Sequence, residues 1–469
     1  MGGAERADES GGEAQLRVPV EQTLGGEGRR LLKLAWPVVL GQLGLMSMGM
    51  VDVLVSGRAG EGVLAAVGAG RTWAWSLILL GMGALHGLDP LISQAWGAGD
   101  RAEGERTLGR GLLLGLLLSA PIAALHLFAG PGLRALGQPL DIIDEAHEYA
   151  LIAGAAVPFV MIYTVLVRYH QGQGRTRLPM VAVVVGNVLN LVLDLSLVQG
   201  LEWGPLSVPA MGVRGVALAT SSVQVAMVAV MAWLSRADLR AALAHGRRLL
   251  DAGPMRALVV LCVPLALQTA LEAWAFNVAG LMVGTAGRTP LAAHVIVLSI
   301  ASFTFMVPLG VGVAASTRVG NLIGAAHPWQ RAGWLAVALG SGWMGLCGLG
   351  LFLFNVPVLS LFSSDAAVIA AGATMLPIAA AFQLFDGVQA SAFGVLRGAG
   401  DTRWPSVANL LGYWAFGLPL GWLLATRGGM GAQGVWIGLA AGLAFVALSL
   451  LARLAWVARR GAVRLHVEP

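Results

Sequence analysis

Charged residues and cysteines are scarce in this sequence. Asp, Glu, Lys and Arg make up 12% of the 469 residues, against about 25% in a soluble domain, while 57% are hydrophobic. The two cysteines, Cys262 and Cys347, lie in apolar stretches, so no disulfide framework is expected. With a mean hydropathy of +0.75, the chain is too apolar for a soluble protein.

Sequence motifs for several kinds of chemistry are also missing. The eight histidines show no metal-ligand spacing, and neither a nucleophile elbow nor a phosphate-binding Gly-Lys-Ser/Thr loop occurs. We therefore expect no catalytic residues, no metal centre and no cofactor, and we expect an ion or substrate gradient as the energy source. The net charge of +5 does not indicate nucleic acid, because the arginines lie in loops between apolar stretches.

The chain contains twelve apolar stretches of roughly 20 residues, the length that crosses a bilayer as a helix. They begin near Leu31, Val63, Leu108, His147, Met180, Val213, Ala257, Leu291, Ala332, Ala366, Pro405 and Val435. The sequence therefore predicts an all-α polytopic membrane protein with twelve transmembrane helices.

The distribution of basic residues predicts the orientation of these helices. Of the 30 lysines and arginines, 24 lie on the side of the predicted bundle that carries both termini, and four lie on the other side. Cytoplasmic loops carry an excess of Lys and Arg. We therefore expect a multi-pass protein of the cytoplasmic (inner) membrane with both termini in the cytoplasm.

An internal repeat divides the chain into two halves. The phrase Gly-x-Gly-x-Thr-Arg-x-Pro occurs at residues 172–179 and again 226 positions later, at 398–405. Because each half has an even number of spans, both enter the membrane from the same side, which predicts parallel repeats in two pseudo-symmetric six-helix lobes. Duplicated bundles of this kind are typical of secondary transporters.

The expected organisation has five parts. They are a disordered cytoplasmic tail (1–30), an N-terminal six-helix lobe (31–235), a cytoplasmic linker (236–256), a C-terminal six-helix lobe (257–458) and a cytoplasmic tail (459–469). The first tail is rich in Gly and Glu and has no apolar run, so it is not a signal peptide. The short loops leave no room for a soluble domain, so function must come from residues inside the helices.

Ionisable side chains are costly in hydrocarbon and mark ion or substrate paths. The predicted spans contain few carboxylates: Asp52, Asp89, Asp194, Glu272 and Asp386. Asn187, Asn190 and Asp194 are spaced i, i+3 and i+7, so they share one helix face. They could bind a cation or carry a proton, or they could be structural polar contacts between helices. Thr220 and Ser221 in the next span, and Gln42 in the first, could complete this cluster. Asp52 ends the apolar run of the first span, where it could be functional or could lie at the water interface.

The second half carries two further acids among aromatic residues. Glu272 follows Gln268 by one turn, and Asp386 follows Phe382 by one turn. Apolar surroundings favour the protonated carboxyl, which suits exchange of a proton for a cation, although both acids could instead be structural. The candidates for lining a substrate cavity are Gln42, Gln268, Phe276, Phe382 and Gln389.

Several segments resemble the multidrug and toxic compound extrusion (MATE) family, especially its NorM-type branch. They are Val-Asp-Val-Leu-Val-Ser-Gly-Arg at 51–58, Ser-Gln-Ala-Trp-Gly-Ala-Gly at 93–99, Asn-Val-Leu-Asn-Leu-Val-Leu-Asp at 187–194, Arg-Val-Gly-Asn at 318–321 and Val-Leu-Arg-Gly-Ala-Gly-Asp-Thr-Arg at 395–403. The resemblance runs from about residue 31 to 457. It implies two six-helix lobes that form a V and cation-coupled export of amphipathic organic cations.

The same resemblance implies roles for individual residues. Asp52, Asn190 and Asp194, with Thr220 as a looser match, correspond to the family's first-lobe ion site. Glu272 and Asp386 correspond to the cation site of the second lobe in the NorM-type branch. The coupling ion at these carboxylates is a proton or sodium. Two departures are Val53, where many members have Thr, and Phe382, where some sodium-coupled members carry Tyr. The second departure weakens the case for sodium.

The sequence thus predicts a secondary active antiporter that exports organic cations or drugs in exchange for protons or sodium. We expect it to function as a monomer among membrane lipids, without nucleic acid. One alternative is a lipid or lipid-linked saccharide flippase, which should have a more basic cavity. The other is an intramembrane enzyme, for which no nucleophile–base or metal motif is found.

Overall fold

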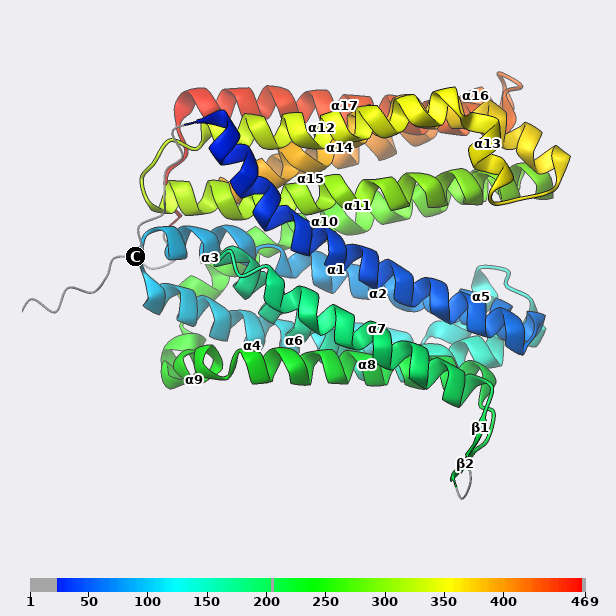
Figure 1. Cartoon of the computed structure of the whole chain (residues 1–469), viewed down its shortest axis with the longest axis horizontal. Coiled ribbons are helices and arrows are strands. Elements are labelled where there is room, and N and C mark those ends of the chain that lie inside the picture. The colour runs from blue at the N-terminus through cyan, green and yellow to red at the C-terminus, as the bar shows by residue number, and fades with distance from the viewer. Residues whose placement is uncertain (1–22, 204–205, 466–469) are drawn as a thin grey trace, which may run out of the picture.

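The computed structural model describes residues 23–203 and 206–465 (Figure 1). Its first half contains α1 (Leu24–Ala59), α2 (Glu61–Leu85), α3 (Leu88–Gly97), α4 (Arg101–His126), α5 (Ala129–Ala135), α6 (Leu140–Gly172), α7 (Arg177–Val198), β1 (Leu201–Trp203), β2 (Leu206–Val208), α8 (Gly212–Leu234), α9 (Arg236–Ala244) and the 3₁₀ helix η1 (Gly246–Leu250). Its second half contains α10 (Ala252–Gly284), α11 (Arg288–Gly324), α12 (Gln330–Leu353), α13 (Asn355–Ser360), α14 (Ala366–Gly398), α15 (Arg403–Asn409), the π-helix η2 (Leu410–Gly417), α16 (Leu418–Thr426) and α17 (Gly431–Arg460).

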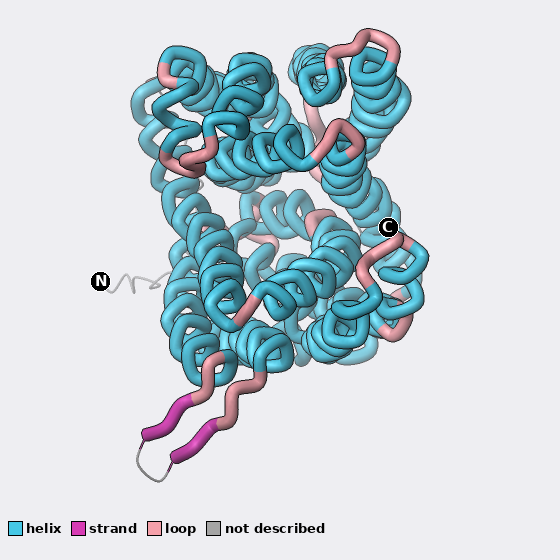
Figure 2. The backbone as a smooth tube through the Cα atoms, turned by 90° about the vertical axis from the view of Figure 1, so that its right-hand side faces the viewer, coloured by secondary structure: helices cyan, strands magenta, loops and turns pink. Residues whose placement is uncertain are grey.

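The described residues contain twelve helical segments that are long and apolar enough to cross a membrane. The second of these joins α2 to α3, and the eleventh joins α15, η2 and α16. Corresponding spans of the two halves have similar lengths: 36 and 33 residues for the first pair, 37 and 37 for the second, and 33 and 33 for the fourth. The prediction of an all-α protein with twelve spans is confirmed. The strands β1 and β2 form a short antiparallel hairpin that projects from the bundle (Figure 2).

The repeated phrase has the same conformation in both halves. It ends α6 in the first half and α14 in the second, and its second glycine has a positive φ in each copy, 78° at Gly174 and 84° at Gly400. The same pair of backbone hydrogen bonds, 2.8 and 2.8 Å in one copy and 2.9 and 2.9 Å in the other, closes the two helix ends. Glycine is suited to this left-handed position because it has no Cβ. The duplication is therefore visible in the turns as well as in the sequence.

The two lobes have separate apolar cores, and α1 contacts both lobes. Two clusters of buried apolar side chains lie mainly among α1–α8, and a third lies among α10–α17. Leu31 and Ala35, near the start of α1, belong to the core of α10–α17, whereas Met48 and Val55 further along belong to the cores of the first lobe. Figure 1 shows α1 beginning beside α12 and crossing to the other half of the bundle.

Both described chain ends lie at one end of the bundle, which we call the terminal end (Figure 1). There α3 of the first lobe packs directly on α11 of the second. A Cβ at Gly97 would collide with the backbone carbonyl of Asn321, and a Cβ at Gly324 would collide with that of Gln94. The side-chain amide of Asn321 donates to Ser93 O at 2.8 Å. Glycine therefore allows the lobes to close tightly at the terminal end.

The structure also describes parts of the predicted tails and linker. α1 begins at Leu24, so residues 24–30 are helical, whereas residues 1–22 of the predicted tail lie outside the described residues. The region predicted as a linker, 236–256, contains α9, the 3₁₀ helix and the first turn of α10. In the predicted C-terminal tail, α17 ends at Arg460, and residues 466–469 lie outside the described residues.

Candidate functional site

The first lobe gathers three of its sequence-predicted residues around one buried carboxylate. Asp52 on α1 is 3% exposed. Asn190 Nδ2 on α7 donates to Asp52 Oδ1 at 3.0 Å, and Thr220 Oγ1 on α8 donates to Asp52 Oδ2 at 3.4 Å. Two other helices, α7 and α8, thus donate hydrogen bonds to this carboxylate of α1, which are the partners that a buried charge requires.

Asp194 lies next to this cluster but lacks such partners. It is fully buried one turn beyond Asn190 on α7, within electrostatic reach of Asp52. Among the described residues, no donor meets hydrogen-bond distance and angle at either carboxyl oxygen of Asp194 or at Asn190 Oδ1, although Asp52 and Asn190 lie close to Asp194. Buried acceptors without donors are costly. Three such oxygens side by side fit a bound cation or a proton shared between carboxyls. We call Asp52, Asn190, Asp194 and Thr220 the first-lobe acid site.

Two other predicted residues of the first lobe do not join this site. Asn187 is only partly buried, and its Nδ2 donates to Val183 O of its own helix at 2.9 Å. Gln42 lines a separate small cavity of about 60 Å³ together with Tyr163 and Arg168. The i, i+3, i+7 pattern predicts that Asn187 shares a face of α7 with Asp194. Asn187 nevertheless lies about two turns from Asp194 along the helix.

Arg71 lies beside the first-lobe acid site but was not among the residues predicted from the sequence. It extends from α2 toward α1, where Arg71 Nη1 donates to Gly49 O at 2.9 Å and lies 3.9 Å from Asp52 Oδ2. A basic residue inside an apolar span was the signal that could have identified it.

In the second lobe, side-chain amides donate hydrogen bonds to the carboxylate of Glu272. Gln389 Nε2 on α14 donates to Glu272 Oε1 at 3.0 Å, and Asn409 Nδ2 at the end of α15 donates to Glu272 Oε2 at 2.9 Å. Tyr413 Oη in the π-helix donates to Gln389 Oε1 at 3.3 Å, which orients the amide so that its NH₂ group points at Glu272. Asp386, 7% exposed, lies within electrostatic reach of Glu272. We call Glu272, Asp386, Gln389 and Asn409 the second-lobe acid site.

The structure therefore places Glu272 and Asp386 within electrostatic reach of one another, a relationship that the sequence left open. Asn409 and Tyr413 were missed by the sequence argument, although an asparagine inside an apolar span is a detectable signal. π-helical turns are rare and often found at functional sites. Asn409 ends α15 and Tyr413 lies four residues later in η2, so the two side chains lie on nearly the same face.

The remaining candidates of the second lobe lie around this site. Gln268 is 4% exposed and within hydrogen-bonding reach of Glu272. Phe276 packs on Phe382 and Tyr413, with ring centroids 6.1 and 5.8 Å apart. Phe382 is 2% exposed, so these two phenyl rings form an apolar wall inside the lobe.

At the terminal end, buried ion pairs connect the two lobes. Asp89 Oδ2 on α3 lies 3.1 Å from Arg397 Nε on α14 and 3.7 Å from Arg168 Nη1 on α6. Arg318 on α11 forms a bidentate pair with Glu27 of α1 at 2.6 and 2.8 Å. These side chains are all less than 9% exposed. Asp89, one of the few carboxylates in the predicted spans, is thus part of the contact between lobes.

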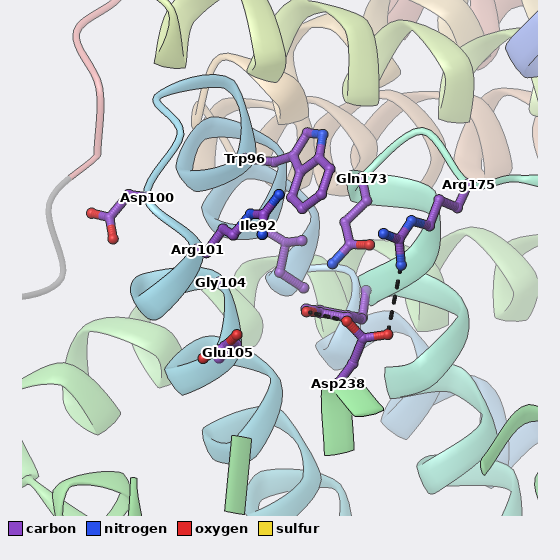
Figure 3. A pocket seen from close by; sticks show the side chains of 10 residues that line it. Ile92, Trp96, Asp100, Arg101, Gly104, Glu105, Gln173, Arg175 and Asp238 are labelled. Atoms are coloured by element: carbon purple, nitrogen blue, oxygen red, sulfur yellow. Dashed lines mark hydrogen bonds and ion pairs between the residues drawn. The ribbon is translucent and has the colours of Figure 1, made fainter. Parts of the chain in front are cut away.

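The terminal end also has a pocket of about 120 Å³ on the first lobe (Figure 3). Figure 3 shows Arg175 reaching Asp238, an ion pair of 3.6 Å, while Tyr169 Oη donates to Asp238 at 3.3 Å. None of the predicted site residues lines this pocket. The described residues contain no group of three or more His, Cys, Asp or Glu side chains placed to hold a metal ion.

Twelve membrane-crossing helices in two repeated lobes, each with buried carboxylates from several helices, define a membrane transporter. The chain belongs to the MATE family: the family profile described as MatE matches residues 37–195 and 264–423, one segment in each half.

Relatives along the whole chain agree with this membership. A Mesorhizobium japonicum protein called "Probable multidrug resistance protein NorM" is 36% identical over 460 residues, covering 95% of this chain and 97% of that protein. A Burkholderia vietnamiensis protein called "Multidrug resistance protein NorM" is 34% identical over 426 residues, covering 89% and 91%.

Solved structures agree with the fold. A mutant of the Vibrio cholerae MATE transporter VcmN superposes with a TM-score of 0.84 at 23% identity, covering 94% of this chain and 99% of that one. The eukaryotic MATE transporter AtDTX14 superposes with a TM-score of 0.83 at 24% identity, covering 93% and 99%.

Proposed function

We propose that this protein is a NorM-type secondary antiporter that exports amphipathic organic cations or drugs in exchange for protons or sodium. The observation that carries the proposal is the pair of acid sites, one in each lobe. In each, a carboxylate is held by uncharged amide or hydroxyl donors and lies beside a second carboxyl. Such a pair can release one cation and accept another, which is the exchange that an antiporter requires.

The two acid sites support roles for the predicted residues. We assign ion coupling to Asp52, Asn190, Asp194 and Thr220 in the first lobe and to Glu272 and Asp386 in the second. Phe276, Phe382, Gln268 and Gln389 surround the second-lobe carboxyls, where aromatic faces and amides would contact an organic cation. Asn187 and Gln42 lie outside both sites and are weaker candidates.

The orientation follows from the basic residues. We place the terminal end in the cytoplasm of a bacterial inner membrane, as the excess of Arg and Lys on that side indicates. The interlobe contacts at the terminal end then correspond to an outward-facing state, closed toward the cytoplasm. We retain the lobe limits 31–235 and 257–458, the intervening linker and the monomeric state as parts of the proposal.

The test is efflux of ethidium from proteoliposomes, driven separately by a proton or a sodium gradient. Wild type should export ethidium under one gradient. Glu272→Gln, Asp386→Asn and Asp194→Asn should insert normally but lose most coupled efflux, because each removes a charge that alternates between ion and substrate. If neither gradient moves ethidium, the antiporter assignment fails and flipping of a lipid or lipid-linked saccharide becomes the function to measure. The acidic character of the buried sites disfavours that second function.

A further inference from the structure

The first-lobe acid site contains a positive charge supplied by the protein itself. The guanidinium of Arg71 extends from α2 to α1 and lies 3.9 Å from Asp52 Oδ2. The side chain of Arg71 is 30% exposed, whereas the carboxylate side chain of Asp52 is buried, so the arginine approaches the carboxylate from the more open side. The distance permits an ion pair without the short hydrogen bond that would fix it.

The backbone of α1 is shaped to accept this arginine. Arg71 Nη1 donates to Gly49 O at 2.9 Å, three residues before Asp52. A Cβ at position 49 would collide with Arg71 Nη2, so any residue other than glycine would push the guanidinium away. Gly49 itself is buried. The slot at Gly49 therefore keeps the charge near Asp52 while leaving the side chain free to withdraw.

The charges around the site can be counted from each packed helix. α1 contributes Asp52, α2 contributes Arg71, α6 contributes Tyr149, and α7 contributes Asp194, whereas α8 contributes the uncharged Thr220. On the outer rim, Arg214 of α8 is paired with Glu148 of α6. If Arg71 neutralises Asp52, Asp194 is the other carboxyl of the site that can take up a proton or a cation.

We propose that Arg71 is a tethered counter-cation for Asp52 and restricts the first-lobe acid site to one transported cation at a time. This inference rests on the proposed antiport function. When the guanidinium pairs with Asp52, it occupies the position of a second cation. When it withdraws, Asp52 becomes available to the incoming ion, and its return favours release. Arg71 is thus a specificity-determining residue, setting how many cations the site holds.

The test follows the protonation of carboxyls in the full-length protein by infrared spectroscopy at neutral pH. Asp52 and Asp194 lie within electrostatic reach of one another, so removal of the nearby positive charge favours protonation of one of the pair. Arg71→Gln should therefore gain one protonated-carboxyl C=O band relative to wild type, and the double variant Arg71→Gln/Asp52→Asn should lose it. Arg71→Lys keeps the charge and should match wild type. A variant with a merely structural defect would not gain a band that depends on Asp52.

Two further measurements keep the result unambiguous. Arg214→Gln, which removes an arginine from the rim of the same lobe, should add no band. Ethidium efflux of wild type tests the antiport function separately, since the infrared result does not depend on transport. The counter-cation proposal is overturned if Arg71→Gln folds, as judged by a monodisperse preparation, and shows no additional carboxyl band. Failure of wild-type efflux with the band present would overturn the antiport function alone.

Discussion

Asn409 donates its side-chain NH₂ to Glu272 Oε2 at 2.9 Å and thereby links α15 to α10 inside the second lobe. Gln389 Nε2 donates to the other carboxylate oxygen, so both oxygens of Glu272 accept a hydrogen bond from an uncharged amide. Each donor stabilises the ionised carboxylate relative to the protonated one. This geometry fits the ion-coupling role that we propose for Glu272.

Asn409→Leu should impair coupling, because it leaves one oxygen of a buried carboxylate without its donor. A lost buried bond to a charged group costs about 2 kcal/mol, so coupled ethidium efflux should fall about tenfold or more. Tyr413→Phe removes only the hydroxyl that orients Gln389 and should have a smaller effect. Initial efflux rates at matched insertion levels give the comparison. Equal rates for Asn409→Leu and wild type would exclude a role for this bond.

Asp89→Asn should weaken the closure at the terminal end. The carboxylate lies between Arg397 and Arg168, and its removal leaves two buried guanidinium groups without their shared counter-charge. Breaking a buried pair from one side costs roughly 3 kcal/mol. Spin labels at positions 101 and 327, one in each lobe, should show a broader distance distribution, and thermal stability should fall.

The surface pair Arg134–Asp144 gives the matched control for this variant. Asp144 is 93% exposed, so Asp144→Asn should change neither the distance distribution nor the thermal stability, because exposed pairs contribute little. If Asp89→Asn behaves like Asp144→Asn, the buried ion pair does not hold the lobes together.

The fold was predictable from the sequence because its causes are local. Apolar stretches of sufficient length predict spans, and the repeated Gly-x-Gly phrase marks equivalent helix ends. Contacts between distant segments were not predictable. The hydrogen bond between Glu272 and Asn409 depends on how α10 packs against α15. If either helix were rotated by one residue relative to the other, its side chain would point to another face. Asn187 shows the same limit, since helical spacing predicts a shared face but not which residues along that face meet Asp52.

The ion pair between Asp100 and Arg464 should hold the segment that follows α17 against the first lobe at neutral pH. Partial burial raises the pKa of Asp100, but hydrogen bonds from Glu103 N and Arg464 outweigh it and keep the pKa below its ordinary value of 3.8. A lowered pKa means that the stabilisation is complete above the ordinary value and is lost as pH falls through the lowered pKa. The contact should therefore be intact at pH 7 and released only under strongly acidic conditions.

Tryptic cleavage after Arg464 measures this contact. Arg464 Nη2 lies 2.9 Å from Asp100 Oδ2, so Asp100→Asn should speed cleavage at pH 7 several-fold, whereas Asp251→Asn at an exposed position should not. An unchanged cleavage rate in Asp100→Asn would show that the pair does not retain the segment.

Gly97→Ala should prevent full closure at the terminal end with the smallest possible change. A Cβ at Gly97 would overlap the carbonyl carbon and oxygen of Asn321, and backbone atoms in a helix cannot move aside as a flexible side chain can. The lobes must therefore separate to admit one methyl group. The labels at positions 101 and 327 should report a longer mean distance, and ethidium efflux should slow because one of the two alternating states is destabilised. Gly104→Ala is the control, since a Cβ there meets nothing within 4 Å. This substitution adds a methyl group to α4 without touching the other lobe, so a longer distance in both variants would trace the effect to the labels rather than to the contact between α3 and α11.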